Sequence, residues 1–472
     1  MKKRIFVDVS NIVGHDLHTG IQRVVKEITK SFVKPENNFD IELMPFRFTA
    51  QGTVPIPHDD LNWLASDKVL TERTNDDVAA RALRNVTAGK VVLDVFRGLF
   101  YRAKVSIANF IRNEHFSHFL LGSARNKGTL NSYLTFGLMR APLAIHGEAT
   151  GIEPNIREGD VVLLLDSSWD VQNFRDHLAR FKSKGARTVS VMYDVIPLSH
   201  SQFVVPGLTT AFRKSLGALV RGADQIITIS ASELVTVKKY VQDDPGFLER
   251  TSPLDFGYFH LGCNLPDDSR GGMGLNHGLP DHFLALKSGE FEHSCIFLCV
   301  GTVEPRKNID LVLDGFFQVW LKRRDVILVL VGKPGWKTEK LQQRIAKHPL
   351  LDKNIFWSST LNDSGLMWLY GNSDYLLQAS VTEGFGLPIV EAMVAGKPIL
   401  CSDIPVFHEV AGEKALYFDP ADAGSLAKRV NKLADLPKAN RNLAIDRKAW
   451  ITWDESAARL LGQIYPGECS GQ

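Results

Sequence analysis

The sequence predicts an α/β protein with two doubly wound, parallel-sheet (Rossmann-like) domains that face each other across a cleft. The first observation is length, because 472 residues exceed what one ordinary hydrophobic core holds. The second is a series of short apolar segments, followed by turns and helical patterns, that starts again after residue 290. Continuous Val/Ile/Leu runs are typical of strands buried on both faces of a parallel sheet, and intervening helices are typical of βαβ crossovers.

The expected strands fall into two series. The first series occupies residues 4–10, 160–166, 188–194 and 225–230, with helical patterns over 20–32, 173–185 and 231–241. The second series occupies residues 295–301, 326–332, 354–359, 375–380 and 398–403. Gly, Pro, Asn and Asp are frequent between the two, over residues 261–283, as in a linker. We therefore expect one domain over 1–262, a linker over 263–283 and a second domain from 284.

Composition excludes several classes of protein. The chain is 44% hydrophobic and 23% charged, which is typical of globular proteins and not of disordered or fibrous ones. A net charge of +2 does not favour nucleic acid as a partner of the whole chain. Five scattered cysteines without a CxxC pair favour a reducing compartment, with neither disulfides nor a zinc site. There is no signal-peptide pattern and no apolar run of about 18–20 residues, so we expect a soluble, cytoplasmic protein.

A basic segment at about 75–150 interrupts the first series. Between Arg81 and Arg140 there are ten Lys/Arg and two acidic residues, with aromatic residues among them. Such an insert can lie on the anionic, cytoplasmic surface of the membrane as a peripheral contact, or bind an anionic acceptor. It is equally consistent with a solvated basic face over a core-facing aromatic stripe. Both interpretations remain open.

The segment EGFGLPIVEAMVAG (383–396) places two carboxylates around a predicted helix start. Pro388 suits the first helical turn and Gly396 suits the position just after the helix end. The helix follows an expected strand, so its N-terminus opens at the sheet edge where α/β proteins bind ligands and where phosphate is favoured. Glu391, one turn inside, can accept hydrogen bonds from a ribose diol, while Glu383 faces the reacting part of the ligand. The alternative is that both acids are solvated charges near a helix start.

A second loop of the same domain carries two adjacent cations. The segment LCVGTVEPRKNIDLVLDGF (298–316) ends a strand at Gly301 and presents Arg306 and Lys307 before a helical pattern. An arginine fork beside a lysine charge can bind a diphosphate. A solvated pair of loop cations is the alternative, but two such features at strand ends of one domain favour a shared site.

Together these motifs resemble the retaining glycosyltransferases of family four, which have the GT-B fold and an E-x7-E signature. Glu383 and Glu391 match that signature, and the resemblance extends over most of the C-terminal half, particularly to the mannosyltransferase-like branch. Its residues are GTVEPRKN (301–308), LVGKPGW (330–336), LYGNSDYLLQASVTEGFGLPIVEAM (369–393) and EVAGEKALYFDPAD (409–422). The resemblance implies that the nucleotide-sugar domain covers 284–450 and that a terminal helix in 451–472 crosses back to the N-terminal domain.

The resemblance also implies roles for single residues. Lys307, with Arg306 beside it, binds the donor diphosphate, Glu391 binds the ribose, and Glu383 contacts the donor sugar near the reacting centre. Backbone amides reach the sugar or phosphate around three residues, which are Gly384, Phe385 and Gly386.

The match to the family is weaker in the first domain. In HTGIQRV (18–24), Gly20 corresponds to a glycine loop near the phosphates, but the usual paired glycines are absent. In VMYDVIPLSH (191–200), Tyr193 stands where relatives carry histidine, and Asp194 remains. Whether Tyr193 and Asp194 contact the acceptor is left open by the sequence.

The implied reaction is transfer of a sugar from a nucleotide-diphosphate donor to a saccharide or lipid-linked saccharide, in surface polysaccharide (O-antigen or capsule) assembly. Mannose or a derived deoxy sugar is the sugar that the resemblance implies. Departure of the diphosphate builds negative charge on phosphate and positive charge on the sugar, which Arg306, Lys307 and Glu383 are placed to offset. The chain has no D-x-D triplet, so we expect no metal and no cofactor besides the nucleotide-sugar substrate.

Two other classes of function stay open at this stage. One is a sugar-nucleotide epimerase or phosphorylase with a GT-B-like fold, which would cleave the donor without an acceptor sugar. The other is a non-catalytic interaction protein that keeps the fold. The presence of both glutamates and both cations argues against loss of catalysis. A measured turnover would decide between an enzyme and an interaction protein.

Overall fold

The structure is a computed structural model that describes residues 2–12, 20–49, 52–56, 154–167, 171, 173–247, 252–264, 279–287, 291–441 and 450–467. The chain divides into two compact units, of which one is 1–56 together with 154–472 and the other is 57–153. Every described residue belongs to the first unit. The basic insert predicted at about 75–150 lies outside the described residues, and so does most of the predicted linker.

The first sheet has seven strands in the order β3-β2-β1-β4-β5-β6-β7. All neighbours are parallel except β2 and β3, which are antiparallel. The strands are β1 (Lys3–Asp8), β2 (Ile41–Phe48), β3 (Thr53–Pro55), β4 (Val161–Leu164), β5 (Arg187–Met192), β6 (Gln225–Thr228) and β7 (Asp255–Tyr258). The sequence patterns predicted β1, β4, β5 and β6 but not β2, β3 or β7.

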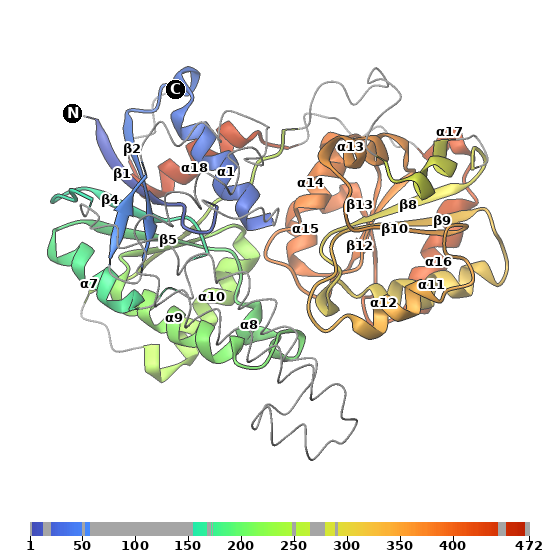
Figure 1. Cartoon of the computed structure of the whole chain (residues 1–472), viewed down its shortest axis with the longest axis horizontal. Helices are drawn as coiled ribbons and strands as arrows, with labels where there is room; N and C mark the ends of the chain where they lie inside the picture. The colour runs from blue at the N-terminus through green and yellow to red at the C-terminus, as the bar shows by residue number, and fades with distance from the viewer. Residues whose placement is uncertain are drawn as a thin grey trace, which may run out of the picture. The chain divides into compact units, whose positions relative to one another are not determined.

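Helices cover both faces of this sheet (Figure 1). They are α1 (Gly20–Val33), α7 (Phe174–Ser183), α8 (Ile196–Ser199), α9 (Leu208–Gly222), α10 (Ala231–Asp243) and α18 (Trp453–Ile464). Helix α18 packs against α1, where Asp454 accepts hydrogen bonds from Ser31 Oγ at 2.6 Å and Lys34 Nζ at 2.8 Å. The C-terminal helix thus adds to a domain built from the first half of the chain.

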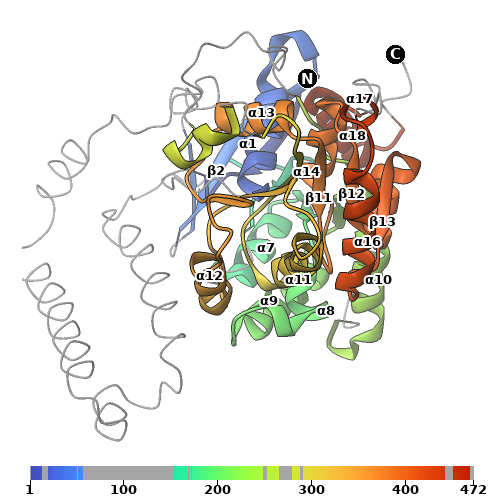
Figure 2. The same ribbon diagram turned by 90° about the vertical axis from the view of Figure 1, so that its right-hand side faces the viewer.

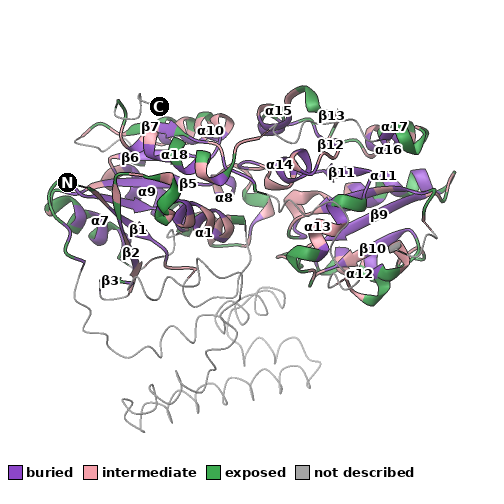
Figure 3. Ribbon diagram, turned by 90° about the horizontal axis from the view of Figure 1, so that it is seen from above, coloured by how far each residue is buried: buried purple, intermediate pink, exposed green. Residues whose placement is uncertain are grey.

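The second sheet has six parallel strands in the order β10-β9-β8-β11-β12-β13. They are β8 (Cys295–Val300), β9 (Val326–Val331), β10 (Ile355–Ser358), β11 (Tyr375–Gln378), β12 (Ile399–Ser402) and β13 (Ala415–Phe418). Central strands such as β9 and, in the first sheet, β5 are buried almost throughout (Figure 3). Their continuous apolar sequences are therefore explained by burial on both faces.

The helices of the second sheet also lie on both of its faces. They are α11 (Ile309–Trp320), α12 (Glu339–Ala346), α13 (Asp363–Asn372), α14 (Leu387–Val394), α15 (Pro405–Ala411), α16 (Ala423–Ala434) and α17 (Lys438–Arg441). Helices α11 and α16 pack side by side on one face (Figures 1 and 2). Short 3₁₀ turns occur at Pro35–Asn37, Ser201–Phe203, Pro245–Phe247, Asp281–Lys287, Pro305–Lys307 and Gly412–Lys414.

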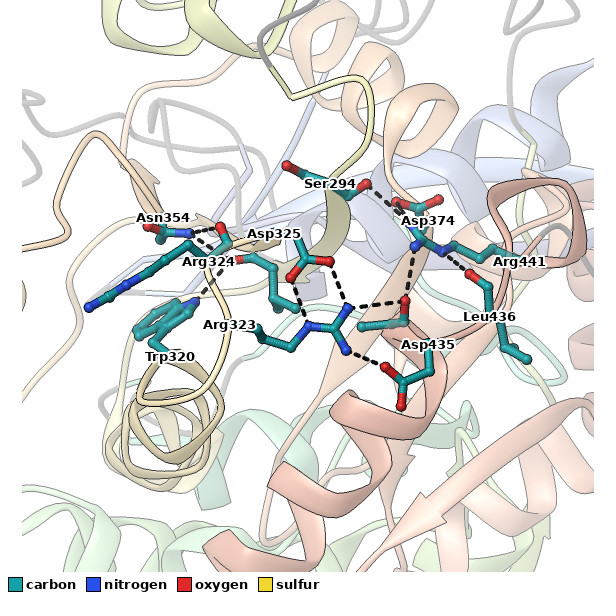
Figure 4. A network of polar contacts seen from close by, with 12 residues as sticks. Ser294, Trp320, Arg323, Arg324, Asp325, Asn354, Asp374, Asp435, Leu436 and Arg441 are labelled. Atoms are coloured by element: carbon teal, nitrogen blue, oxygen red, sulfur yellow. Dashed lines mark hydrogen bonds and ion pairs between the residues drawn. The ribbon is translucent and has the colours of Figure 1, made fainter.

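A network of hydrogen bonds and ion pairs stabilises the amino-terminal edge of the second sheet (Figure 4). Arg323 makes two hydrogen bonds to Asp325, at 2.7 and 2.6 Å, just before β9 begins. Arg441 is buried and donates to the carbonyl oxygens of Ser294, Ala434 and Leu436 at 3.1, 3.0 and 2.9 Å. This network lies at the strand starts, so the opposite edge, where the strands end, remains for the loops that carry the predicted site.

Direct contacts join the two sheet domains. Glu409 of α15 accepts hydrogen bonds from the backbone N–H groups of Ala231 and Ser232, both at 2.7 Å, and therefore caps helix α10 of the other domain. His260 Nε2 lies 2.7 Å from the same carboxylate. Hydrogen bonds bring the pKa of Glu409 to about 2, although burial alone raises it. The cap is thus made by an ionised carboxylate.

Candidate functional site

The predicted cations sit on the loop after β8. Gly301 ends this strand with a φ of 142°, and a Cβ there would lie 3.4 Å from the Lys307 side chain. Pro305–Lys307 forms a 3₁₀ turn that Asn308 closes in the left-handed conformation. The neighbouring strand β11 ends beside this loop and carries Glu383 after it. The two loops that the sequence singled out are therefore adjacent.

Glu383 is the centre of a compact charged cluster. Its carboxylate accepts a hydrogen bond from Arg306 Nη1 at 2.6 Å, one from Ser380 Oγ at 2.7 Å and one from Lys307 Nζ. Arg306 also pairs with buried Glu304 at 2.7 Å. Both predicted cations are thus within reach of the predicted sugar-contacting glutamate, at the carboxyl edge of the sheet.

The electrostatics of this cluster keep Glu383 ionised. Burial by itself raises the pKa of Glu383, but the charges of Arg306 and Lys307 outweigh it and hold that pKa at about 2. For Glu304 the balance is reversed, since burial raises its pKa against the opposing charge of Arg306. A carboxylate that stays negative at neutral pH can stabilise positive charge that develops on a nearby sugar.

Asp194 of the first domain faces the same cluster. Burial raises the pKa of Asp194, and the charge of Arg306 opposes the rise. Buried Glu233 lies behind it, and its carboxylate accepts a hydrogen bond from Val195 N at 2.9 Å. Burial, reinforced by the charge of Asp194, raises the pKa of Glu233 to about 8. Asp194 lies on the turn after β5, and Glu233 reaches this turn from the first turn of helix α10.

Tyr193, which stands where relatives carry histidine, does not direct its side chain toward the charged cluster around Glu383. Its hydroxyl donates a hydrogen bond of 2.7 Å to Leu165 O, and its side chain is buried in the first domain. Burial raises the pKa of Tyr193 well above its ordinary value, so the hydroxyl stays protonated. Of the two positions that the sequence left open, Asp194 is the one that faces the charged cluster.

Gly384 lies at a close approach between the two domains. A Cβ at this position would lie 2.1 Å from Tyr193 O, so no side chain fits there. Ser230 Oγ donates a hydrogen bond of 2.8 Å to Gly384 O. The ring of Phe385 is buried and packs near His260 and Trp450, with centroids 6.0 and 5.8 Å away. The glycine and the phenylalanine therefore hold the domains together, a role that the sequence did not suggest.

Glu391 is buried on α14, which begins after Gly386 with a φ of 110° and carries Pro388 in its first turn. Its Oε2 accepts a hydrogen bond of 2.6 Å from the Tyr370 hydroxyl. Its Oε1 accepts one from Arg23 of α1, in the other domain. Glu391 therefore meets the N-terminal turn of the helix that starts at Gly20.

The sequence interpretation missed Arg23, Tyr370, Glu304 and Glu233. Arg23 stands three residues after Gly20 in the quoted segment HTGIQRV, and Glu304 lies beside Arg306 in GTVEPRKN. For Arg23 and Glu304, the available signal in the sequence was their position beside a predicted site residue. Tyr370 lies in the quoted segment 369–393, and Glu233 ends the S-x-x-E helix start at 230–233, but neither pattern indicates a partner, because the partners come from other elements.

Neither a metal cluster nor a membrane-spanning helix is seen where the structure is described. Across the described ranges, no group of three or more His, Cys, Asp or Glu side chains could hold a metal ion. Within the same ranges, no helix has the length and apolar character needed to cross a membrane.

The chain is similar to known sugar-transferring proteins in sequence. Residues 284–450 match the family described as glycosyl transferases group 1. The serotype-specific mannosyltransferase WbdA of Escherichia coli is 33% identical over 283 residues, which are 60% of this chain and 34% of WbdA. The O-antigen chain mannosyltransferase RfbU of Salmonella typhimurium is 36% identical over 143 residues, 30% of this chain and 39% of RfbU. The chain thus spans little more than a third of the length of these relatives.

Solved structures show the fold. Sucrose-phosphate synthase of Thermosynechococcus elongatus aligns with a TM-score of 0.54 at 14% identity, over 98% of each chain. HepE of Anabaena, solved in complex with UDP, aligns with a TM-score of 0.53 at 13% identity, over 98% of this chain and 99% of HepE. The solved structures confirm the predicted GT-B fold, and the sequence matches confirm the resemblance to glycosyltransferases of the mannosyltransferase-like branch, which over residues 284–450 is a match to the glycosyl transferases group 1 family.

Proposed function

We propose that this chain is a retaining, metal-independent glycosyltransferase. It moves a sugar, mannose or a derived deoxy sugar, from a nucleotide-diphosphate donor to a saccharide or lipid-linked saccharide acceptor. Its place is in O-antigen or capsule assembly. Two similarities support this proposal, since WbdA and RfbU are both mannosyltransferases and RfbU is an O-antigen chain mannosyltransferase.

One observation carries the proposal. Arg306, Lys307 and Glu383 converge at the carboxyl edge of the sheet, in the domain that matches the glycosyl transferases. This edge is where open α/β sheets bind ligands. Two cations provide the charge that a diphosphate requires, and an ionised carboxylate between them provides the opposite charge for a cationic sugar.

The chemistry follows from these charges. The bond between the sugar C1 and the phosphate oxygen breaks, and its electrons stay on the departing diphosphate, which Arg306 and Lys307 stabilise. Positive charge develops on the sugar ring near Glu383. The acceptor oxygen bonds to C1 on the same face, and its proton passes to a phosphate oxygen. No side-chain base is assigned, because the leaving group itself takes the proton.

The roles of the two glutamates of the signature differ. Glu391 would bind the nucleotide ribose in the ground state and in the transition state alike, so its loss should raise KM. Glu383 would act on charge that develops in the transition state, so its loss should lower kcat.

The test combines a donor panel with two variants. GDP-, UDP- and dTDP-sugars are screened by thermal shift, since a ligand that binds the native state stabilises it, and the hits are assayed for transfer. Glu383→Gln and Glu391→Gln are then compared with the control Glu339→Gln, an exposed glutamate of α12. The proposal expects turnover to fall with Glu383→Gln and KM to rise with Glu391→Gln.

Three results would contradict the proposal. Absence of turnover with every donor and a mixed glycan acceptor pool would favour an interaction protein. Donor cleavage that proceeds unchanged without any acceptor would favour an epimerase or phosphorylase. Equal losses of affinity in both variants, with turnover kept, would refute the division of roles.

A further inference from the structure

Glu391 is held from two directions by side chains of two domains. Tyr370 of α13 donates to Oε2 at 2.6 Å from within the same domain. Arg23 of α1 donates to Oε1 from the other domain, although it lies 368 residues away in the sequence. Each carboxylate oxygen therefore has its own donor, and the plane of the carboxylate is defined by both.

The burial of this group makes its partners necessary. The side chain of Glu391 is 6% exposed, whereas that of Arg23 is 39% exposed. A buried carboxylate without a charged partner is costly, and breaking such a pair leaves the remaining charge uncompensated. Tyr370 supplies a neutral donor, because burial and the charge of Glu391 raise the pKa of its hydroxyl well above the ordinary value. Arg23 supplies the positive charge.

A second contact supports the placement of Arg23. A Cβ at Gly20, the first residue of α1, would lie 3.7 Å from Leu387 Cδ1, at the first residue of α14. The N-terminal turns of α1 and α14 are thus in contact independently of the ion pair. Arg23 follows Gly20 by less than one helical turn, so the backbone of α1 already brings its side chain toward Glu391.

We propose that Arg23 is a positioning residue for nucleotide recognition, which orients the Glu391 carboxylate toward the ribose hydroxyls of the donor. The inference rests on the proposed function and adds to it. Discrimination between ribose and deoxyribose in the donor then depends on a residue of the first domain, although the nucleotide is bound by the second.

A competing mechanism predicts the opposite sign. If Arg23 merely occupied Glu391 and had to leave before the ribose could bind, its removal would strengthen donor binding. If Arg23 only stabilised the fold, its removal would lower the melting temperature without changing which ribose is preferred. The preference for a ribose donor over a deoxyribose donor separates positioning from these two alternatives. Only positioning predicts that removal of Arg23 lowers this preference.

The experiment uses the full chain and the donor found active in the panel, together with the 2′-deoxy and 3′-deoxy forms of the same nucleotide sugar. Steady-state kinetics are measured for wild type, Arg23→Met, Arg23→Lys and Tyr370→Phe. The matched control is Lys30→Met, which removes the same charge two turns further along α1. Calorimetric melting temperatures check that each variant is folded.

Positioning predicts that wild type prefers the ribose donor by about tenfold or more, as expected for a hydrogen bond to a charged group. Arg23→Met should lose most of this preference through a higher KM for the ribose donor, with kcat near that of wild type. Arg23→Lys should recover part of it, Tyr370→Phe should lose part of it, and Lys30→Met should keep it.

Each remaining outcome overturns the inference. An Arg23→Met variant that keeps the preference, or that binds the ribose donor more tightly, excludes positioning. A wild type that turns over its donor without distinguishing the deoxy forms removes the ribose role of Glu391 and this inference with it, while glycosyl transfer stands. A wild type with no turnover refutes the proposed function itself. If Arg23→Met does not fold, Arg23→Lys and Tyr370→Phe decide by the same preference.

Discussion

Replacing Glu409 by glutamine should weaken the junction between the two sheet domains in a pH-dependent way. The carboxylate caps α10 through the N–H groups of Ala231 and Ser232 and also contacts His260. Its pKa falls from an ordinary 4.5 to about 2. At about 1.4 kcal/mol per pKa unit, the shift sets an upper limit of roughly 3 kcal/mol at pH 7, and solvent screening of this partly exposed carboxylate lowers the contribution below that limit.

The sign of the pH dependence follows from the depressed pKa. The contribution is fully present above pH 4.5 and is lost as pH falls toward 2, because the unfolded chain binds the proton first. Glutamine cannot ionise, so the gap in unfolding free energy between wild type and variant should shrink on acidification. About a quarter of the gap should be gone by pH 4 and more than half by pH 3.

Urea unfolding followed by circular dichroism at pH 7, 5, 4 and 3 measures the gap. Glu413→Gln is the matched control, since this exposed glutamate lies four residues further on. A gap that is the same at every pH would show that shape, and not charge, accounts for the effect of Glu409→Gln. Equal stability of wild type and Glu409→Gln at pH 7 would refute the capping argument altogether.

Three further predictions follow from the site and the insert. Lys307→Ala should weaken donor binding by about 1.5–3 kcal/mol with the fold intact, because a charge-assisted contact is lost; unchanged affinity in calorimetry would exclude a diphosphate role. Glu233→Gln should keep an oxygen that accepts from Val195 N–H. Because the fold raises the pKa of Glu233 to about 8, wild type loses stability as pH rises from 4.5 to 8, and the variant should become more stable relative to wild type over this range. A stability difference that is equal at pH 5 and pH 9 would contradict this. Neutralising four cations within Arg81–Arg140 should remove salt-sensitive co-sedimentation with anionic liposomes, at up to about 1 kcal/mol per cation; equal sedimentation of both proteins would favour a solvated face. That variant carries glutamine at Arg97, Arg102, Lys104 and Arg112.

Strands buried on both faces were the most predictable part of the fold. Val326–Val331 is apolar at every position, so burial and sequence coincide. Strand β2, in contrast, includes Pro45 and is only partly buried, because the short antiparallel β3 beside it leaves it near the sheet edge. Its pattern is too weak to separate from a loop. The boundaries of α14 were predicted well, since Pro388 and Gly396 act through the backbone alone.

The candidate site was predictable only within its own loops. Arg306, Lys307 and Glu383 follow neighbouring strands, so the rule that parallel strands end at one edge was sufficient to bring them together. The partner of Glu391 comes from the other domain, and no spacing in the sequence marks Arg23 for it. Tyr193 shows the same limit, since only the structure shows its hydroxyl turned toward Leu165.

The pairing of Arg306 and Lys307 with Glu383 bears on how the spent nucleoside diphosphate would leave. In a site with unbalanced positive charge, departure of the diphosphate would leave a partly buried cation without a negative partner, and release of the diphosphate would be slow. Here Glu383 can take over both cations as the phosphate moves away, so departure becomes an exchange of one anion for another. Such a built-in counter-ion favours rapid release of the nucleoside diphosphate and weak product inhibition.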